Sequence, residues 1–497
     1  MTDRSVTAAD VTESTRPARP SLGVFVVTAA GGLLVSLDVS IANALLPAIG
    51  RDFTDDSRAA LSWVITGYAI VFAAVLVPAG RVADRAGRRR TYAGGLAVFA
   101  LGSLVCGLAP SLGVLLAGRL LQGVGAAAAS PASLALLLAH CSPRDRSSYA
   151  ARWTGAAATG VCLGPLVGGA LTDAGDWRLA FLVNLPVAAA VMVCAPRLLP
   201  ETPRHPGRPL PDPLGAVVFA LAAASVTLVL SEISTWGAGS PRSVGGLVAA
   251  VTLTVLFVRR ATRVEEPLLD VALLRNRRVA AAAVVTCCYA AGFFGFLLTM
   301  MLFFVDRWHL GVVVAGAAVL PTGVVVIIAT THVGRAADQV GHRLLLAVGA
   351  AVMAATLLAS AASLGGSGFE ARWLVLGPVM GLGIGLCYPV LAGAAVHGLP
   401  AGDLAAASAL NQCARQVGAA VGVAAAVGIL GSTAIPTLDR FHTAWVVGAL
   451  FSAAAVAAAS LIPRDASSRR SREDDGVPTS PPTVEELPCG PQPWSTR

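Results

Sequence analysis

The chain of 497 residues is strongly apolar: hydrophobic residues make up 55% and charged residues 13%, against roughly 25% charged residues in soluble proteins. This excludes an ordinary soluble protein, and at roughly 20 residues per crossing the apolar residues suffice for at most about fourteen membrane helices. The net charge of +8 includes 36 basic residues, all Arg, and no Lys occurs. Without lysine, a P-loop ATPase and a Schiff-base enzyme are excluded.

Apolar stretches between polar breaks predict fourteen membrane helices. In chain order they lie at 22–49, 60–79, 92–109, 112–136, 152–172, 179–199, 214–232, 244–258, 279–305, 312–333, 344–364, 372–396, 404–431 and 443–462. The stretch 244–258 is short for a crossing, so thirteen helices are the alternative. Residues 1–20 lack the apolar core of a signal peptide, so the first helix is expected to remain.

The distribution of arginine predicts the orientation of these helices. With the N-terminus inside, the inner segments hold 27 Arg and the outer segments seven. Because positive residues favour the cytoplasmic side, both termini are predicted to be cytoplasmic. The positive charge is then explained by topology and lipid contact, with no nucleic acid required.

The sequence contains an internal repeat. Segment 80–89 recurs at 334–343, and segment 123–131 recurs at 381–389, at nearly the same offset. Two parallel six-helix repeats with two helices inserted between them account for this order. The predicted divisions are a disordered tail at 1–20, a first half at 21–200, inserted helices with flanking loops at 201–278, a second half at 279–462 and a disordered tail at 463–497.

Four motifs resemble those of the major facilitator superfamily. They are Leu37-Asp38-x-Ser40-Ile41-x-Asn43, the loop Gly80-Arg81-x-x-Asp84-Arg85-x-Gly87-Arg88-Arg89, the fourth-helix pattern Leu115-x3-Arg119-x2-Gln122-Gly123 and the fifth-helix pattern Gly160-x3-Gly164-Pro165-x2-Gly168-Gly169. The likeness covers about residues 20–462 and is similar to the fourteen-helix drug:proton antiporter branch. It implies an all-α integral membrane bundle of 14 helices that works by alternating access.

The basic loop at 80–89 contains one acid, Asp84, among five Arg that extend to residue 90. A carboxylate there can accept hydrogen bonds from Arg or from a helix N-terminus. The resemblance implies a gating latch formed by this loop, with Asp338 as the counterpart in the second repeat. Anchoring by positive charge is the simpler alternative.

Asp38 is the only acid well inside a predicted span, about 16 residues from its start. A carboxylate at that depth is costly, which favours a functional role. Burial favours its neutral form and a nearby cation its charged form, so it can load and release a proton. Arg119 lies within ~5 Å of the same depth, so the two are expected to meet. Protonation would weaken this pair, and a cationic substrate would compete for the carboxylate; the alternative is a purely structural ion pair.

Two further groups are candidates for the transport path. The glycines of the fifth-helix motif allow close helix approach, Pro165 should kink the helix, and the resemblance implies that this favours antiport; packing alone is the alternative. Arg415 and Asn411, with Gln412 and Gln416, form a polar stripe that either lines the substrate path or bonds between helices. Phe293, Phe294, Phe296, Phe303, Phe304 and Tyr388 are candidates for an apolar pocket.

The resulting prediction is a proton-coupled antiporter of the plasma or inner membrane that exports drugs, antibiotics or similar hydrophobic small molecules. The alternative is an exporter or proton symporter of an endogenous metabolite. No Ser/His/Asp set, paired carboxylates or metal-ligand spacing occurs, so no enzyme activity, metal or cofactor is expected. The expected partners are the substrate, protons and lipid, with no nucleic acid and no obligate protein partner.

Overall fold

The computed structural model describes residues 20–141, 146–199, 201, 211–399, 403–431 and 435–463, and within them it contains helices and no β-strand. The helices are α2 (Leu22–Asp52), α3 (Arg58–Ala86), α4 (Arg88–Gly107), α5 (Leu112–Ala139), α6 (Arg146–Asp173), α7 (Leu179–Leu182), α8 (Asn184–Leu198), α9 (Pro213–Trp236), α10 (Pro241–Ala261), the 3-10 helix η2 (Val271–Arg275), α11 (Arg277–Asp306), α12 (Val312–Val340), α13 (His342–Ser363), α14 (Trp373–Val396), α15 (Leu404–Leu430) and α16 (Leu438–Ser460). The predicted tails at 1–20 and 463–497 lie almost entirely outside the described residues.

Within the described part of the chain, fourteen helical segments are long and apolar enough to cross a membrane, with α7 and α8 forming one of them. The predicted number and the predicted fold class are confirmed. The short stretch 244–258 is extended in α10 to 21 residues, about 31 Å of helix. The extension begins where the Ser240 side chain accepts from the Ser243 amide and Pro241 occupies the first turn, a favoured way to start a helix.

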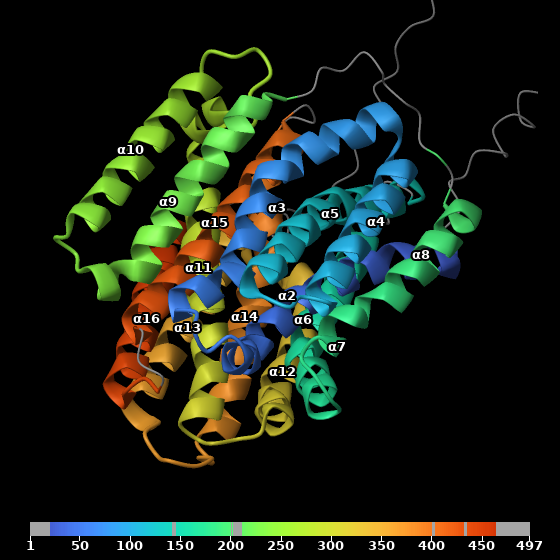
Figure 1. Ribbon diagram of the computed structural model, residues 1–497. Helices are drawn as coiled ribbons and strands as arrows, with labels where there is room; N and C mark the ends of the chain where they lie inside the picture. The colour runs from blue at the N-terminus through green and yellow to red at the C-terminus, as the bar shows by residue number, and fades with distance from the viewer. Residues whose placement is uncertain are drawn as a thin grey trace, which may run out of the picture.

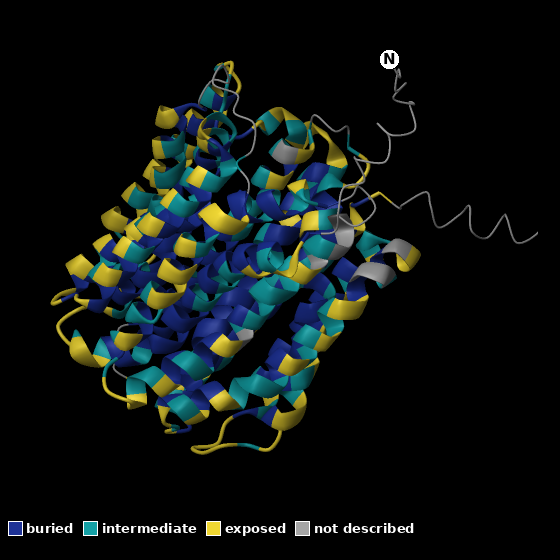
Figure 2. Cartoon of the chain, turned by 90° about the vertical axis from the view of Figure 1, so that its right-hand side faces the viewer, coloured by how far each residue is buried: buried dark blue, intermediate teal, exposed yellow. Residues whose placement is uncertain are grey.

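The helices form one bundle, with α9 and α10 side by side on one flank (Figure 1). Helix α9 packs against α3 and α15, and α10 packs against α9. Elsewhere α6 packs against both α2 and α12. Figure 2 shows buried residues inside the bundle and exposed residues on its outer surface. The division into two repeats and its boundaries stay a prediction.

The exposed face of α10 is apolar. Leu247, Val248 and Val251 have exposed fractions of 57%, 59% and 56%. Single exposed apolar residues are common on soluble proteins, but a continuous apolar helix face suits a hydrocarbon environment. Helix α10 therefore has the surface of a lipid-facing helix.

Polar contacts tie the ends of the inserted helices to the rest of the bundle. Asp212 caps α9 by accepting from the Leu214 amide at 3.1 Å, and Arg260 at the end of α10 donates to Asp212 at 2.9 Å. The hydrogen bond from Arg260 holds the pKa of the Asp212 carboxyl below its usual range. Glu266, whose carbonyl accepts from the Asp212 amide, forms an ion pair with Arg81 of α3 at 3.1 Å.

Candidate functional site

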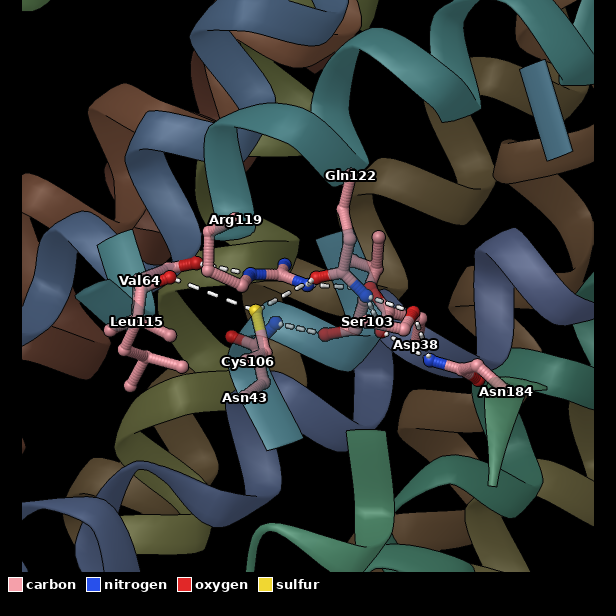
Figure 3. Close-up of polar contacts among 10 residues, drawn as sticks. Asp38, Asn43, Val64, Ser103, Cys106, Leu115, Arg119, Gln122 and Asn184 are labelled. Atoms are coloured by element: carbon pink, nitrogen blue, oxygen red, sulfur yellow. Dashed lines mark hydrogen bonds and ion pairs between the residues drawn. The ribbon is translucent and has the colours of Figure 1, made fainter. Parts of the chain in front are cut away.

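Asp38 of α2 and Arg119 of α5 form an ion pair inside the bundle (Figure 3). Arg119 Nη1 lies 2.6 Å from Asp38 Oδ2, and the exposed fractions of the two side chains are 0% for Asp38 and 1% for Arg119. The prediction that these residues meet is confirmed. The helix rise places them at similar depths, and the facing surfaces of α2 and α5 bring them into contact.

Three neutral side chains complete a hydrogen-bonded network around the carboxylate (Figure 3). Gln122 Nε2 and Asn184 Nδ2 each donate to Asp38 Oδ1 at 2.9 Å, and Gln122 Nε2 also donates to Ser103 Oγ at 2.8 Å. Arg119 Nη1 donates to Gln122 Oε1 at 2.7 Å. Each hydrogen bond that Asp38 makes to Arg119, Gln122 and Asn184 is one that its carboxylate accepts, so protonation would weaken these bonds.

The network also contacts α3, through Arg119. Its Nε donates to the Val64 carbonyl at 2.7 Å, and its guanidinium lies 4.5 Å from the ring centroid of Tyr68, one turn further along α3. A guanidinium over an aromatic face is an attractive arrangement. With Ser103 on α4 and Asn184 on α8, the network joins five helices.

Beside the network lies a cavity of about 280 Å³, close to the lower limit of small-molecule sites. Its wall is formed by α2, α3, α5, α6, α11, α12, α14 and α15. Val35 and Val39 of α2 line it, whereas Asp38 and Arg119 do not. Tyr68 lines the cavity and contacts Arg119. In this conformation a substrate can contact the network through Tyr68 without meeting the carboxylate.

One side of the cavity is aromatic. Phe293, Phe294, Phe296 and Tyr388 line it, and the ring centroid of Phe293 lies 5.0 Å from that of Phe294 and 5.9 Å from that of Tyr388. Such rings provide broad apolar contact for a bound molecule.

Two aromatic residues predicted for this pocket lie elsewhere. Phe303 and Phe304 are fully buried and pack against Trp445 and Trp308. They lie further along α11, beyond the cavity wall, so helical spacing alone did not distinguish packing aromatics from lining ones.

The cavity wall also has a polar part, which includes the predicted stripe of α15 and adjoins Tyr388. Asn411, Gln412, Arg415 and Gln416 all line the cavity. Arg415 Nε donates to Gln412 Oε1 at 2.8 Å, and Arg415 Nη1 donates to Tyr388 Oη. Asn411 Oδ1 accepts from Thr286 of α11 at 2.6 Å. The two alternatives from the sequence, cavity lining and bonding between helices, therefore both occur.

The predicted gating loop is almost wholly helical. Gly80, Arg81, Asp84 and Arg85 belong to the end of α3, and Arg88 and Arg89 begin α4. Only Gly87 separates the two helices; its φ of +103° is readily adopted by glycine and rarely by other residues.

Ion pairs connect this junction to its surroundings. Arg88 lies 3.7 Å from Asp84. Arg89 donates to the Leu199 carbonyl at 3.0 Å and pairs with Glu201 at 3.6 Å. The junction is therefore joined to the end of α8. The Asp338 side chain lies outside what the structure describes, and the gating role of both acids stays a prediction.

The fifth-helix glycines provide close contact between α6 and α2. A Cβ added at Gly160 would lie 2.6 Å from the Leu33 carbonyl oxygen, and one added at Gly164 would lie 2.6 Å from Ser40 Oγ. Ser40 Oγ also donates to the Val161 carbonyl at 2.6 Å. The predicted close approach is confirmed at these positions.

The same motif faces α12. A Cβ added at Gly169 would lie 2.7 Å from the Val312 carbonyl oxygen, and one at Gly316 would lie 2.7 Å from the Pro165 carbonyl carbon. Gly168 has room for ordinary contacts with α2. Pro165 lies within α6, which continues on both sides of it. Helix α6 thus packs tightly on both α2 and α12.

The sequence analysis did not identify several residues that the structure places in the site. Gln122 stood within a quoted motif, but Ser103, Asn184 and Tyr68 carried no such signal. Asn184 had one usable sign, an amide within the apolar stretch 179–199. Polar side chains inside a membrane helix tend to bond to neighbouring helices.

Comparisons with known proteins agree with this architecture. A family profile described as Major Facilitator Superfamily matches residues 28–423. A lincomycin resistance protein of Streptomyces lincolnensis is 33% identical over 403 residues, covering 80% of this chain and 82% of the relative. A tetracenomycin C resistance and export protein of Streptomyces glaucescens is 30% identical, covering 84% and 77%. The crystal structure of a peptide transporter with sulfate has a TM-score of 0.66 at 16% identity, covering 92% and 99%, which concerns the fold alone.

Proposed function

This chain belongs to the Major Facilitator Superfamily, and from that membership we propose that it is a multi-pass membrane exporter of drugs or antibiotics driven by inward proton movement. The single observation that carries the proposal is the aromatic cavity that contacts the sealed Asp38–Arg119 network through Tyr68. Its relatives named for lincomycin resistance and for tetracenomycin C resistance and export support export of such compounds.

Asp38 is the proposed proton carrier. It is a fully buried carboxylate whose described partners all donate hydrogen bonds, so taking up a proton would weaken the bonds through which it holds these helices together. Buried membrane acids commonly serve such roles. One proton moving inward across ~100 mV supplies about 2.3 kcal/mol, which supports a roughly fifty-fold substrate gradient.

The proposed orientation places both termini in the cytoplasm, in a plasma or inner membrane. The excess of arginine on one set of connecting segments supports it. The helix junction at 80–89 and the fifth-helix glycines are the proposed gating and antiport elements. The junction contacts the end of α8, and the glycines contact α2 and α12. Contacts of this kind would have to break and form again as access alternates.

Export is tested in a bacterial host that lacks its own major drug pumps. Cells with and without this chain are loaded with lincomycin or tetracenomycin C, and cellular drug is measured by mass spectrometry. We expect lower accumulation in cells that carry the chain and loss of the difference on adding a protonophore. Equal accumulation for the whole panel would contradict drug export, and a difference that survives the protonophore would contradict proton drive.

A further inference from the structure

Among the residues that the structure describes, the cavity wall contains one charged residue, Arg415, and no Asp, Glu or His. Within the described part of the chain Arg415 has no ion pair, and its side-chain hydrogen bonds go to neutral Gln412 and Tyr388. Asp38 does not balance this charge, because it is paired with Arg119 and sealed from the cavity. The binding space therefore carries a net positive charge.

An unbalanced cation inside a membrane protein is costly. Arg415 is half-buried, and the donors on its guanidinium exceed the two that its protein partners occupy, since a guanidinium carries five N–H groups. A ligand that brings an oxyanion would form charge-assisted hydrogen bonds here. A ligand that brings a cation would meet Arg415 with no carboxylate in the wall to bind it.

Two residues of the same wall carry a buried hydroxyl that has no hydrogen-bond partner among the described residues. Tyr68 Oη and Thr322 Oγ1 belong to residues with exposed fractions of 2% and 6%, and both residues line the cavity. Buried hydroxyls are rarely left without a partner. They stand on α3 and α12, and both oxygen atoms are sealed from the cavity, so a ligand in this conformation reaches Arg415 but neither hydroxyl.

We propose that the cavity selects amphipathic organic monoanions, with the oxyanion on Arg415 and a ring-bearing body against Phe293 and Phe294. The ring of Tyr68 lies in the cavity wall and against Arg119, and so connects the ligand to the network. This proposal rests on the proposed function and names the substrate class of that site. Gln412 and Tyr388 act as positioning residues that hold the guanidinium toward the cavity.

The test uses the purified full-length chain in lipid nanodiscs and isothermal titration calorimetry with three matched probes. They are 1-naphthaleneacetate, its neutral amide 1-naphthaleneacetamide and the cation 1-naphthylmethyl-trimethylammonium. We expect the acetate to bind at least tenfold more tightly than the other two. Arg415→Gln should remove this preference by weakening the acetate tenfold or more while leaving the amide unchanged. Arg242→Gln, which changes an exposed arginine at the start of α10, should leave all three affinities unchanged.

A second variant keeps the proposal testable if Arg415→Gln does not fold. Tyr388→Phe keeps a ring in the cavity wall and removes the hydroxyl that accepts from Arg415, so acetate binding should weaken several-fold and amide binding less. Equal or tighter binding of the amide or cation by the unchanged protein overturns the proposal, as does no binding of any probe. Anion preference without export overturns only the proposed function, whereas export with cation preference overturns only this inference.

Discussion

At the scale of single residues, the charge balance between Asp38 and Arg119 decides whether the bundle tolerates them. Asp38→Asn leaves a buried cation without its partner, which costs about 3–5 kcal/mol. Asp38→Asn combined with Arg119→Gln removes both charges and should recover most of that loss. The measurement is thermal unfolding of the purified variants in detergent. Asp52→Asn is the matched control, because its ion pair with Arg178 is partly exposed and should contribute at most about 1 kcal/mol.

The same variants separate stability from coupling. The double variant is expected to fold and to exchange substrate down its gradient, yet to lose export driven by a pH gradient. A double variant as unstable as Asp38→Asn would mean that the hydrogen bonds, and not the charges, hold the network together. Export driven by a pH gradient in the double variant would instead exclude Asp38 as the proton carrier.

Residue positions were predictable only where the helix itself fixes them. The common depth of Asp38 and Arg119 follows from a constant helix rise. Ser103 and Asn184 were not predictable, because small polar residues in membrane helices often bond within their own helix. Thr28 and Thr227 do so, each donating to the carbonyl four residues earlier at 2.8 Å. A single sequence does not say which face of a helix meets a neighbour.

At the scale of helices, the packing of α6 on α2 depends on a side chain being absent. Gly160→Ala places a Cβ 2.6 Å from the Leu33 carbonyl oxygen and 3.0 Å from the Leu37 amide nitrogen. Backbone atoms cannot turn aside, so the helices must separate, at about 1–3 kcal/mol. Gly155→Ala in the same helix has nothing within 4 Å and should be neutral or slightly stabilising. Thermal unfolding of both variants measures the difference, and equal midpoints would mean that α6 shifts without cost.

Helix number was predictable and helix ends were less so. The apolar pattern marks the hydrocarbon thickness, which requires about 20 residues, so all fourteen spans were found. The pattern does not mark where a helix ends in water. The span predicted at 60–79 is the helix Arg58–Ala86, because two polar turns continue until Gly87 reverses the backbone. The segment 80–89, predicted as a loop, is therefore a junction between two helices.

At the scale of the whole molecule, the charge of the substrate sets how strongly voltage drives the cycle. Outward movement of a monoanion and inward movement of one proton together move two charges in the same direction. Across ~100 mV that is about 4.6 kcal/mol, or roughly three orders of magnitude of gradient. A neutral substrate gains from one charge, and a monovalent cation exchanged for one proton gains from none.

This difference is measurable in proteoliposomes with a potassium diffusion potential and no pH gradient. With the interior negative, we expect efflux of 1-naphthaleneacetate to rise most steeply with voltage, efflux of the amide less, and efflux of the trimethylammonium probe not at all beyond the leak from protein-free liposomes. The Asp38→Asn, Arg119→Gln double variant should reduce the voltage dependence of the anion to that of a single charge, because the proton no longer moves with it. Two results would contradict a cycle in which Arg415 binds an anion while Asp38 carries the proton. One is anion efflux that does not depend on voltage, and the other is cation efflux that depends on voltage as steeply as anion efflux does.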